Sequence, residues 1–387
     1  MADRYWVAGG TGNYNSTTNW SATSGGASGA SVPSSADNVF FNGSSGAGTA
    51  TINVASNCAN LNLTGFAGTL AFTNNLDVNG TALNFGTGGY TVTGASQLQL
   101  NTAMTITSNG TSWQGNLFIS GNVTFTLADN LTILGTLSIT SGSSQTINGN
   151  TIFISSNLTS VGNGQTSGTT AFVFNGTGTW SNSSTGVIRN NITVNTAGTL
   201  TISGNVYYNT GTLTYTAGTV ITTGSTLNVA AATTFNTSGM SWNNIAITSG
   251  TQTLNSLFSA NGTMTLSIST IFAGTAGFSV GTLNVSAAGL THQLVSTVTY
   301  TINTAFTCTA ATDASRVLFR STIAASKAIL TLNSGATNNL RFVNATDINS
   351  SLGRTIYSYR GVFSNTNNWS LLSTDPVIST SASTFIN

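Results

Sequence analysis

Residues 116–139 read Asn116-Leu-Phe-Ile-Ser-Gly-Asn-Val-Thr-Phe-Thr-Leu-Ala-Asp-Asn-Leu-Thr-Ile-Leu-Gly-Thr-Leu-Ser-Ile139. Apolar and polar residues alternate with period two in short pieces, and Gly, Asn or Ser-Gly interrupts each piece. Alternation with period two is typical of a strand that buries one face. Pieces this short, separated by turn residues, predict the faces of one coil in a β-solenoid, with a corner at each interruption.

The passage recurs in degenerate form along the middle of the chain. Each copy opens on Asn followed by an apolar-polar-apolar strand, and a Gly-Thr pair follows at nearly the same interval in every copy. The openings are Asn60, Asn116, Asn191 and Asn244, and the pairs are Gly80-Thr81, Gly135-Thr136, Gly211-Thr212 and Gly262-Thr263. Similar passages at irregular spacing are typical of a solenoid whose coils tolerate insertions at their corners. We expect the four openings to occupy equivalent faces.

The composition agrees with an all-β class. Of 387 residues, 8 are Lys or Arg and 7 are Asp or Glu, and Lys327 is the only lysine. Low charge together with 39% hydrophobic residues is not typical of a disordered chain, and the shortage of Glu, Lys and Arg disfavours long helices. A chain of β-sandwiches is the alternative fold, although sandwiches usually bring more Pro and mixed surface charge.

The uneven placement of charge predicts three regions. Residues 1–40 are rich in Gly and Ser and carry large aromatic side chains, so we expect an N-terminal cap or docking segment. Residues 41–312 hold only three charges and should form a parallel β-solenoid (β-helix) of on the order of 13 coils, at roughly 20 residues per coil. Residues 313–387 hold nine charges and should form a distinct C-terminal β segment that acts as a contact or cap region.

Arginine dominates the charge of this last region. Residues 313–387 contain six cations and three Asp, a net charge of +3, and only one of the cations is lysine. Arginine suits fixed, multidentate contacts better than general solubility. We predict that the region contacts a neighbouring subunit or another protein of the assembly through Arg316, Arg320, Arg354 and Arg360. The alternative is a solvated cap whose charges only prevent end-to-end stacking.

The N-terminal segment carries a resemblance to a known group of proteins. The motifs are Arg4-Tyr-Trp-Val-Ala-Gly-Gly-Thr-Gly-Asn-Tyr-Asn-Ser-Thr-Thr-Asn-Trp-Ser21, Gly25-Gly-Ala-Ser-Gly-Ala-Ser-Val-Pro33 and Ala36-Asp-Asn-Val-Phe-Phe41. They resemble low-charge, Thr/Asn/Gly-rich proteins from tailed-phage genomes, including marine and cyanobacterial phages. The match ends near Phe41, with a looser echo in residues 346–351 and 365–370. The resemblance implies a virion structural or fibre-like protein and no particular chemistry.

We therefore expect a non-enzymatic bacteriophage structural protein, either an exposed fibre or spike element or a capsid decoration protein, assembled in the host cytoplasm. The alternatives are a tailspike-type carbohydrate-active enzyme and a host surface adhesin, and the lack of an export signal in the given sequence disfavours the adhesin. Expected partners are copies of the chain itself, with a trimer favoured, other virion proteins, and a host surface glycan. The net charge of +1 predicts no nucleic-acid binding, and no apolar stretch approaches the roughly 20 residues of a membrane-spanning helix.

Candidate catalytic residues are few, and we predict no catalytic, cofactor-binding or metal residue. Glycoside hydrolysis usually needs two carboxylates close together, and we interpret Asp77 and Asp129 as isolated turn aspartates rather than such a pair. His292, the only histidine, should be an outward or hydrogen-bonded structural residue. One histidine with Cys58 and Cys308 cannot supply a strong zinc site, and both cysteines should be buried free thiols.

Aromatic residues offer one binding function. Tyr5, Trp6 and Trp20 near the amino terminus and Trp369 near the carboxyl terminus could stack on sugar rings if they are exposed. Packing inside a cap is the alternative for all four.

Overall fold

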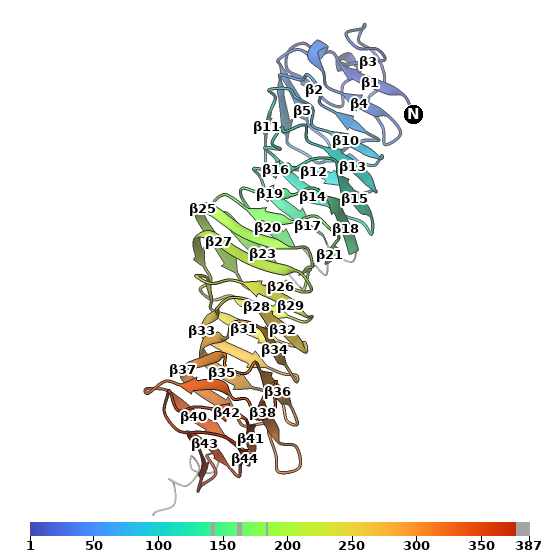
Figure 1. Cartoon of the computed structure of the whole chain (residues 1–387). Coiled ribbons are helices and arrows are strands. Elements are labelled where there is room, and N and C mark those ends of the chain that lie inside the picture. Colours follow the sequence, from blue (N-terminus) through green and yellow to red (C-terminus); the bar gives the residue numbers. More distant parts are fainter. Residues whose placement is uncertain (141–143, 161–164, 183–184, 377–387) are drawn as a thin grey trace, which may run out of the picture. The chain divides into compact units, whose positions relative to one another are not determined.

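The computed structural model of the chain describes residues 1–140, 144–160, 165–182 and 185–376. These residues form a parallel β-solenoid of about 15 turns (Figure 1). Among the described strand pairs, β1 with β3 is the antiparallel one, and the others are parallel. The predicted all-β solenoid is therefore confirmed over the sandwich alternative, because a sandwich consists of antiparallel sheets.

Contacts between residues divide the chain into two compact units. Unit 1 comprises residues 1–202 and 217–221, and unit 2 comprises residues 203–216 and 222–387. This division falls in the middle of the chain, where neither the composition nor the repeat gave a signal.

A coil of unit 1 has three faces. Face 1 carries β4, β7, β10 and β13, face 2 carries β5, β8 and β11, and face 3 carries β6, β9 and β12. The bounds of these strands are β4 (Asn38–Phe40), β5 (Thr49–Ile52), β6 (Ser56–Cys58), β7 (Leu61–Asn62), β8 (Thr69–Phe72), β9 (Leu76–Val78), β10 (Ala82–Asn84), β11 (Thr91–Thr93), β12 (Gln97–Leu100) and β13 (Met104–Thr107). Leu61 lies in register with Leu83, which is the equivalent position one coil later.

The coils continue on all three faces to the end of unit 1, and face 2 is carried onward by the bridge from Trp113 to Ile133 and by the strands that pair with it. Their strands are β14 (Asn116–Ile119), β15 (Thr124–Leu127), β16 (Leu131–Ile133), β17 (Leu137–Ile139), β18 (Ser144–Gly149), β19 (Ile152–Ile154), β20 (Leu158–Ser160), β21 (Gln165–Ser167), β22 (Phe172–Phe174), β23 (Gly178–Asn182), β24 (Val187–Ile188) and β25 (Ile192–Ser203).

The remaining strands include several long ones that run across a corner, and one of these, residues 212–221, has its last five residues in unit 1. They are β26 (Asn205–Tyr208), β27 (Thr212–Ile221), β28 (Thr226–Val229), β29 (Thr233–Asn236), β30 (Ser241–Trp242), β31 (Asn244–Ile247), β32 (Thr251–Leu254), β33 (Phe258–Leu266), β34 (Ile271–Gly274), β35 (Phe278–Val285), β36 (Thr291–Leu294), β37 (Thr299–Cys308), β38 (Val317–Ser321), β39 (Ala328–Leu332), β40 (Thr337–Leu340), β41 (Val343–Thr346), β42 (Ile348–Asn349), β43 (Ile356–Tyr359), β44 (Phe363–Ser364) and β45 (Trp369–Leu372).

The core of each unit is a stack of inward-facing side chains. Leu61, Leu83 and Ile106 follow one another on face 1 in register, and all three are buried. Burying an aliphatic side chain of this size stabilises a fold by about 1.5–3 kcal/mol. Because every coil adds such a layer, the solenoid needs little surface charge to be stable.

The Asn and Gly-Thr repeat has a structural cause. The Asn side-chain oxygen accepts a hydrogen bond from the backbone N–H of the Thr one coil further on. The pairs are Asn60 with Thr81 (2.9 Å), Asn116 with Thr136 (3.0 Å) and Asn244 with Thr263 (2.9 Å). Glycine precedes the Thr because a Cβ at Gly80 would lie 2.4 Å from Asn60 Oδ1, and one at Gly262 would lie 2.5 Å from Asn244 Oδ1.

The expectation that all the openings occupy equivalent faces was wrong. Asn60 precedes β7 and Asn244 opens β31, both in the large sheet that includes face 1, whereas Asn116 opens β14 on face 3. The same hydrogen bond occurs at more than one corner of a coil. The motif therefore predicts a corner but does not predict which of the three faces follows it. Asn130 and Asn157 make it too, with the N–H groups of Thr151 (3.0 Å) and Thr179 (2.9 Å).

The first residues form a folded cap, as predicted. They contain β1 (Asp3–Trp6), β2 (Gly12–Asn13), β3 (Trp20–Ser21) and the short 3-10 helix η1 (Thr17–Asn19), and a second such helix, η2 (Gly43–Ser45), follows β4. β1 pairs in parallel with β4 and antiparallel with β3. Trp6 and Trp20 pack edge to face at 5.2 Å, and Trp20 donates a 2.6 Å hydrogen bond from Nε1 to the Tyr14 carbonyl.

The parallel ladder of unit 2 passes through residue 312. β38 pairs with β36, and β39 and β40 both pair with β37. The predicted boundary at 312 is thus a change in surface chemistry, while the backbone pairing continues. A separate two-stranded sheet of β43 and β45 lies beyond it and agrees with the expected distinct C-terminal β segment.

Candidate functional site

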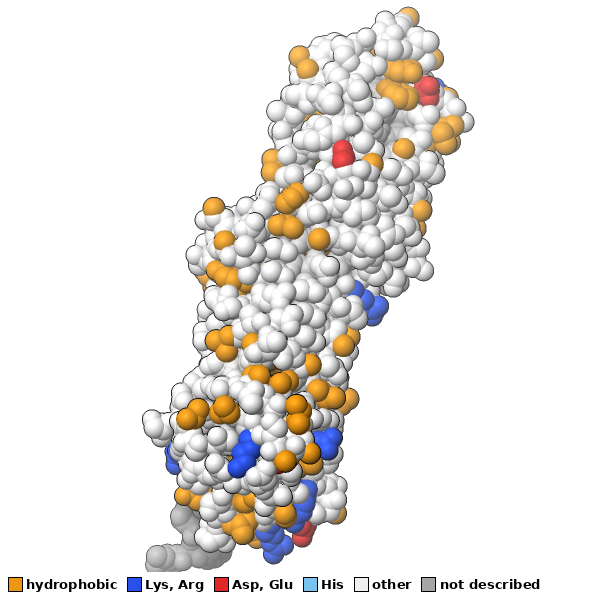
Figure 2. Space-filling view, viewed as in Figure 1, with side chains coloured by type: hydrophobic (Ala, Val, Ile, Leu, Met, Phe, Trp, Pro, Cys, Tyr) orange, Lys and Arg blue, Asp and Glu red, His pale blue; other side chains and the backbone are white. Residues whose placement is uncertain are grey.

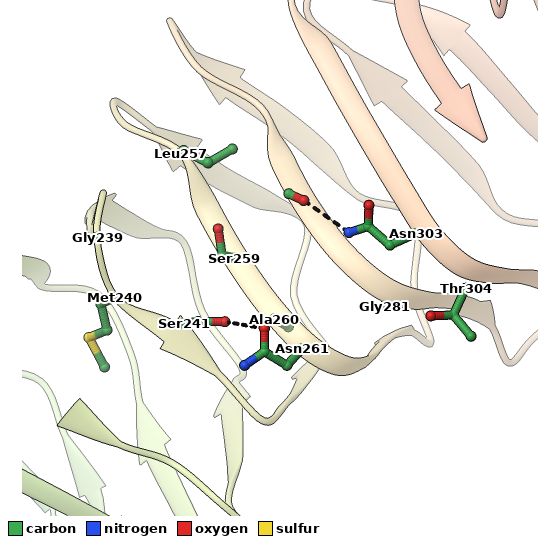
Figure 3. Close-up of a pocket in the computed structure, with 11 residues that line it drawn as sticks. Gly239, Met240, Ser241, Leu257, Ser259, Ala260, Asn261, Gly281, Asn303 and Thr304 are labelled. Carbon is green, nitrogen blue, oxygen red and sulfur yellow. Dashed lines mark hydrogen bonds between the residues drawn. The ribbon is translucent and has the colours of Figure 1, made fainter. Parts of the chain in front are cut away.

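A groove of about 460 Å³ lies in unit 2, beside the corner that β33 and β35 cross (Figure 3). The register between these strands shifts between Ala260 and Thr263, as it does at a β-bulge. The polar side chains in the groove bind one another: Ser241 Oγ contacts Asn261 Oδ1 at 3.1 Å, and Asn303 donates to Ser279 Oγ at 3.1 Å. The lining contains no charged or titratable side chain, so it offers neither an acid nor a base for catalysis.

A second groove, of about 270 Å³, lies on face 1 of unit 1. Its lining residues from β4, β7, β10 and β13 include Phe40, Asn62, Asn84 and Thr107. The ring of Tyr5 stacks on Phe40 with the centroids 4.7 Å apart and the planes at 14°. This groove therefore combines the ring of Phe40, which Tyr5 stacks on, with amide and hydroxyl groups.

Six of the seven carboxylates have polar partners that explain them structurally. Asp129 accepts hydrogen bonds from the backbone N–H groups of Ser108 (2.7 Å) and Asn109 (2.6 Å) and so holds the turn in the preceding coil. The other partners are Asn38 for Asp3, Ser34 for Asp37, Arg316 for Asp313, Ala325 and Asn365 for Asp347, and Arg341 for Asp375.

Asp77 is the exception among them. It lies in the middle of β9 on face 3, not in a turn as expected, between Asn57 and Gln99 of the adjacent coils. Its Oδ1 atom is buried and has no hydrogen-bond partner among the described residues, and burial raises the pKa of this carboxyl. Asp129 follows β15 in the sheet of face 1, so the two aspartates lie on different faces.

His292 differs from its prediction. Its ring points into the core of unit 2, is fully buried and packs 4.9 Å from the ring of Phe319. Neither ring nitrogen has a hydrogen-bond partner among the described residues. Burial lowers the pKa of His292 to about 4, so the imidazole is neutral at physiological pH. The outward or hydrogen-bonded assignment was therefore wrong.

The two cysteines are free and buried, as predicted. Burial raises the pKa of the Cys308 thiol to about 11 and also raises that of Cys58. Both remain protonated thiols at neutral pH and lack the thiolate that nucleophilic or metal chemistry needs. Within the part of the chain that the structure describes, no three His, Cys, Asp or Glu side chains gather as a metal site would require.

The four predicted sugar-stacking aromatics fall into two groups. Trp6 is 1% exposed and Trp20 is 0% exposed, so neither ring face can receive a sugar, and packing inside the cap is the correct interpretation for both. Tyr5 is partly exposed in its stack with Phe40. Trp369 is also partly exposed, and its Nε1 donates to Ser350 Oγ at 2.9 Å.

The four predicted contact arginines do not form one patch. Arg316 and Arg360 lie together, because Arg316 donates to the Arg360 carbonyl and both approach Asp313. Arg354 donates to the carbonyl of Ala336. Arg320 is exposed in the outer row of β38, next to Gln293 of β36, and its guanidinium has no partner among the described residues. Figure 2 shows several Lys and Arg side chains in the part of unit 2 that holds the last strands.

The aromatic partners of these cations were not predicted from the sequence. The ring of Phe342 receives the guanidinium groups of both Arg316 and Arg341, at 5.6 and 5.4 Å, and Arg360 lies over Tyr359 at 5.5 Å. Such contacts are worth about 0.5–1 kcal/mol at exposed sites. The adjacent pairs Arg341-Phe342 and Tyr359-Arg360 were the available signal.

Comparison with protein-family models, with curated proteins and with solved structures found no match. Among the described residues, no helix has the length and apolar character needed to cross a membrane.

Proposed function

We propose that this chain is a non-enzymatic structural component of a virus particle, either an exposed fibre or spike element or a capsid decoration protein. It works by assembly and surface contact. A β-solenoid with neutral outer faces is suited to that role, because its stability comes from stacked coils and its surface remains available for contacts. The resemblance of the N-terminal motifs to those of tailed-phage proteins supports the same setting.

The main support for a non-enzymatic role is that almost all the carboxylates bind groups of their own chain. Six of the seven bind backbone N–H groups, amides, a hydroxyl or arginines of the same chain, as described above. Asp77, the seventh, has amide neighbours in register and no second carboxylate. The rival function, a tailspike-type carbohydrate-active enzyme, usually needs two carboxylates across a glycosidic bond.

The proposal is tested on purified particles and on purified protein. We expect the chain among the proteins of the particle by mass spectrometry, and on its outside by antibody labelling in electron microscopy. Incubation with host capsule or lipopolysaccharide should release no new reducing ends. Release that an Asp77→Asn variant abolishes and an Asp129→Asn variant retains would replace the structural role with the enzymatic one.

Assembly is the mechanism that we propose for this role, with a homo-oligomer, a trimer favoured, and contacts to other virion proteins. Arg320 is the best candidate for such a contact, because Arg316, Arg354 and Arg360 already bind groups of their own chain. Arg320→Gln should reduce incorporation into particles while the protein stays folded. The double variant Arg316→Gln/Arg360→Gln is the matched control and should lower stability before it lowers incorporation.

A further inference from the structure

The groove on face 1 of unit 1 follows a continuous column of outward side chains. Residues in register from one coil to the next are, in order, Tyr5, Phe40, Asn62, Asn84 and Thr107. Figure 1 shows β1, β4, β10 and β13, which carry four of them, along the same side of unit 1. Neighbouring strands in a sheet lie about 4.8 Å apart. The column therefore repeats an outward group at this interval along the coils.

The column begins with an aromatic platform. Tyr5 and Phe40 stack nearly parallel, and both side chains remain partly exposed, in contrast to the buried Trp6 and Trp20 of the same cap. A packed cap could have buried these rings as well. An exposed aromatic face is the surface on which the apolar C–H face of a sugar ring packs.

The next two positions present oriented amides. Asn62 Oδ1 accepts a hydrogen bond from Thr64 N–H at 2.9 Å, and Asn84 Oδ1 accepts from Gly86 N–H at 2.8 Å. These bonds fix which end of each amide is the oxygen. Within the residues that the structure describes, the Nδ2 groups of Asn62 and Asn84 donate to no protein acceptor, so both are donors for a ligand.

The neighbouring column differs in just this respect. Asn60 donates from Nδ2 to Asn38 Oδ1, and Asn38 donates to Asp3 Oδ1, both at 2.8 Å. The amide N–H groups of Asn38 and Asn60 therefore donate to side chains of the same chain. This column forms one wall of the groove. Of these two columns, the one with Asn62 and Asn84 keeps its donors for a ligand.

The lining of the groove is neutral, which limits the class of ligand. No Asp, Glu, Lys, Arg or His contributes to it. Arg4, the nearest cation in sequence, donates to Ser31 Oγ at 2.8 Å, and Asp3 at the end of the neighbouring wall would repel anions. A hollow with an aromatic platform, free amide donors and no charge is suited to an uncharged polyhydroxylated molecule.

We propose that this groove binds a neutral, linear oligosaccharide that lies along the coils with about one sugar ring per coil. The interval of about 4.8 Å between coils is close to the length of one pyranose ring along an extended chain, so equivalent groups meet equivalent positions of the glycan. The inference rests on the proposed contact role and deepens it by naming a neutral glycan as the partner.

The test uses the whole chain and a panel of neutral oligosaccharides of two to six rings with glucose, galactose or mannose backbones, measured by calorimetry. Affinity for at least one series should rise with length up to about four rings and then level off, because the groove spans β4, β7, β10 and β13. Phe40→Thr should weaken binding about ten-fold through loss of the stacking surface. Asn84→Ala should weaken it as well.

The matched control is Phe118→Thr, since Phe118 is also a partly exposed, outward phenylalanine but lies in β14 on face 3. It should leave binding unchanged. Failure of every neutral series to bind at millimolar concentration would overturn the proposal, and so would equal weakening by Phe118→Thr. Each of these results leaves the virion role intact, because that role is judged on particles.

Discussion

The first coil of unit 1 and the last coils of unit 2 use different side chains for the same structural task. In unit 1, Trp6, Trp20 and Phe41 are fully buried and pack ring against ring. In the last coils of unit 2, arginines lie over the rings of Phe342 and Tyr359 and pair with Asp313 and Asp375. The last coils also bury an apolar core, which includes Leu340, Val343 and Ile356, and the partly exposed cations add to it.

The difference predicts how each region responds to salt. Buried rings contribute a free energy that scarcely depends on salt, and they cannot be reached by another molecule. Exposed ion pairs and cation–π contacts contribute about 1 kcal/mol or less each and weaken as salt is added. Salt should therefore weaken the arginine interactions of unit 2 and leave the packing of the tryptophans in unit 1 unchanged.

The largest expected effect is that of removing a buried ring. Trp20→Ala should destabilise unit 1 by about 3–5 kcal/mol, because it leaves a cavity and frees the Tyr14 carbonyl. Trp369→Ala, at a partly exposed ring in unit 2, should cost much less. Urea unfolding followed by circular dichroism and intrinsic fluorescence measures both. Equal costs would contradict the contrast between the two regions.

Acid should distinguish the cores of the two units. The pKa of His292 is lowered by burial from 6.5 to about 4, so the unfolded chain binds a proton that the folded unit 2 does not. Stability should be constant above pH 6.5, fall as the pH drops from 6.5 to 4, and lose about 3 kcal/mol in total from this group.

His292→Phe is the control for this pH dependence, since the ring would still pack on Phe319. Melting temperatures measured at pH 7, 5.5 and 4 should show a steeper loss for the natural chain than for the variant. A parallel decline in both would mean that the carboxylates, and not His292, set the acid sensitivity.

A smaller effect is expected at the Asn corners, and it should differ between the ends. Asn60 Oδ1 accepts from two backbone N–H groups, those of Thr81 and Ala82, whereas Asn338 near the other end accepts from Tyr357 alone. Leaving a backbone donor unpaired costs about 1–3 kcal/mol when it is buried, and less at these partly exposed corners. Asn60→Ala, which also removes the hydrogen bond from Nδ2 to Asn38, should therefore cost at least about twice as much as Asn338→Ala. Thermal unfolding of the two variants gives the ratio, and a ratio of one or below would count against the corner hydrogen bond.

The smallest effect is expected for the arginines. Arg316→Gln should destabilise unit 2 by about 1 kcal/mol, through loss of the contacts with Asp313 and Phe342. The loss should shrink in 0.5–1 M salt, roughly the range where the Debye length falls to a few ångströms. Arg320→Gln, which removes no described contact, should change stability by less than about 0.5 kcal/mol. A salt-independent effect of Arg316→Gln would argue for packing over electrostatics.

The fold was predictable because the local pattern is strict. Period-two pieces such as Leu131-Thr-Ile133, broken by Gly and Asn, leave few alternatives to a solenoid coil, and the Asn and Gly-Thr repeat marked real corners. The face that each passage occupies was not predictable, because corners accept extra residues and the count along the chain then shifts. The composition did not predict the division into two compact units near residues 202–222.

The site residues were predicted less well, for reasons that can be named. The burial of His292 could have been found, since period two places it on the same face as Leu294 in β36. Trp6 and Trp20 were unclear because a cap has no period from which burial can be inferred. The groove column of Phe40, Asn62 and Asn84 needs the register between strands of successive coils, which one sequence does not give.

The uneven length of the coils has a practical consequence. His292 and Phe319 are in register although 27 positions separate them (319 − 292), whereas Leu61 and Leu83 lie closer together along the chain. The additional residues lie in the corner between Cys308 and Val317, and the pairing on either side is unaffected. An insertion at this corner should therefore leave the pairing of β37 with β35 and of β38 with β36 unchanged, because the length of a coil is set by its corners and not by its strands.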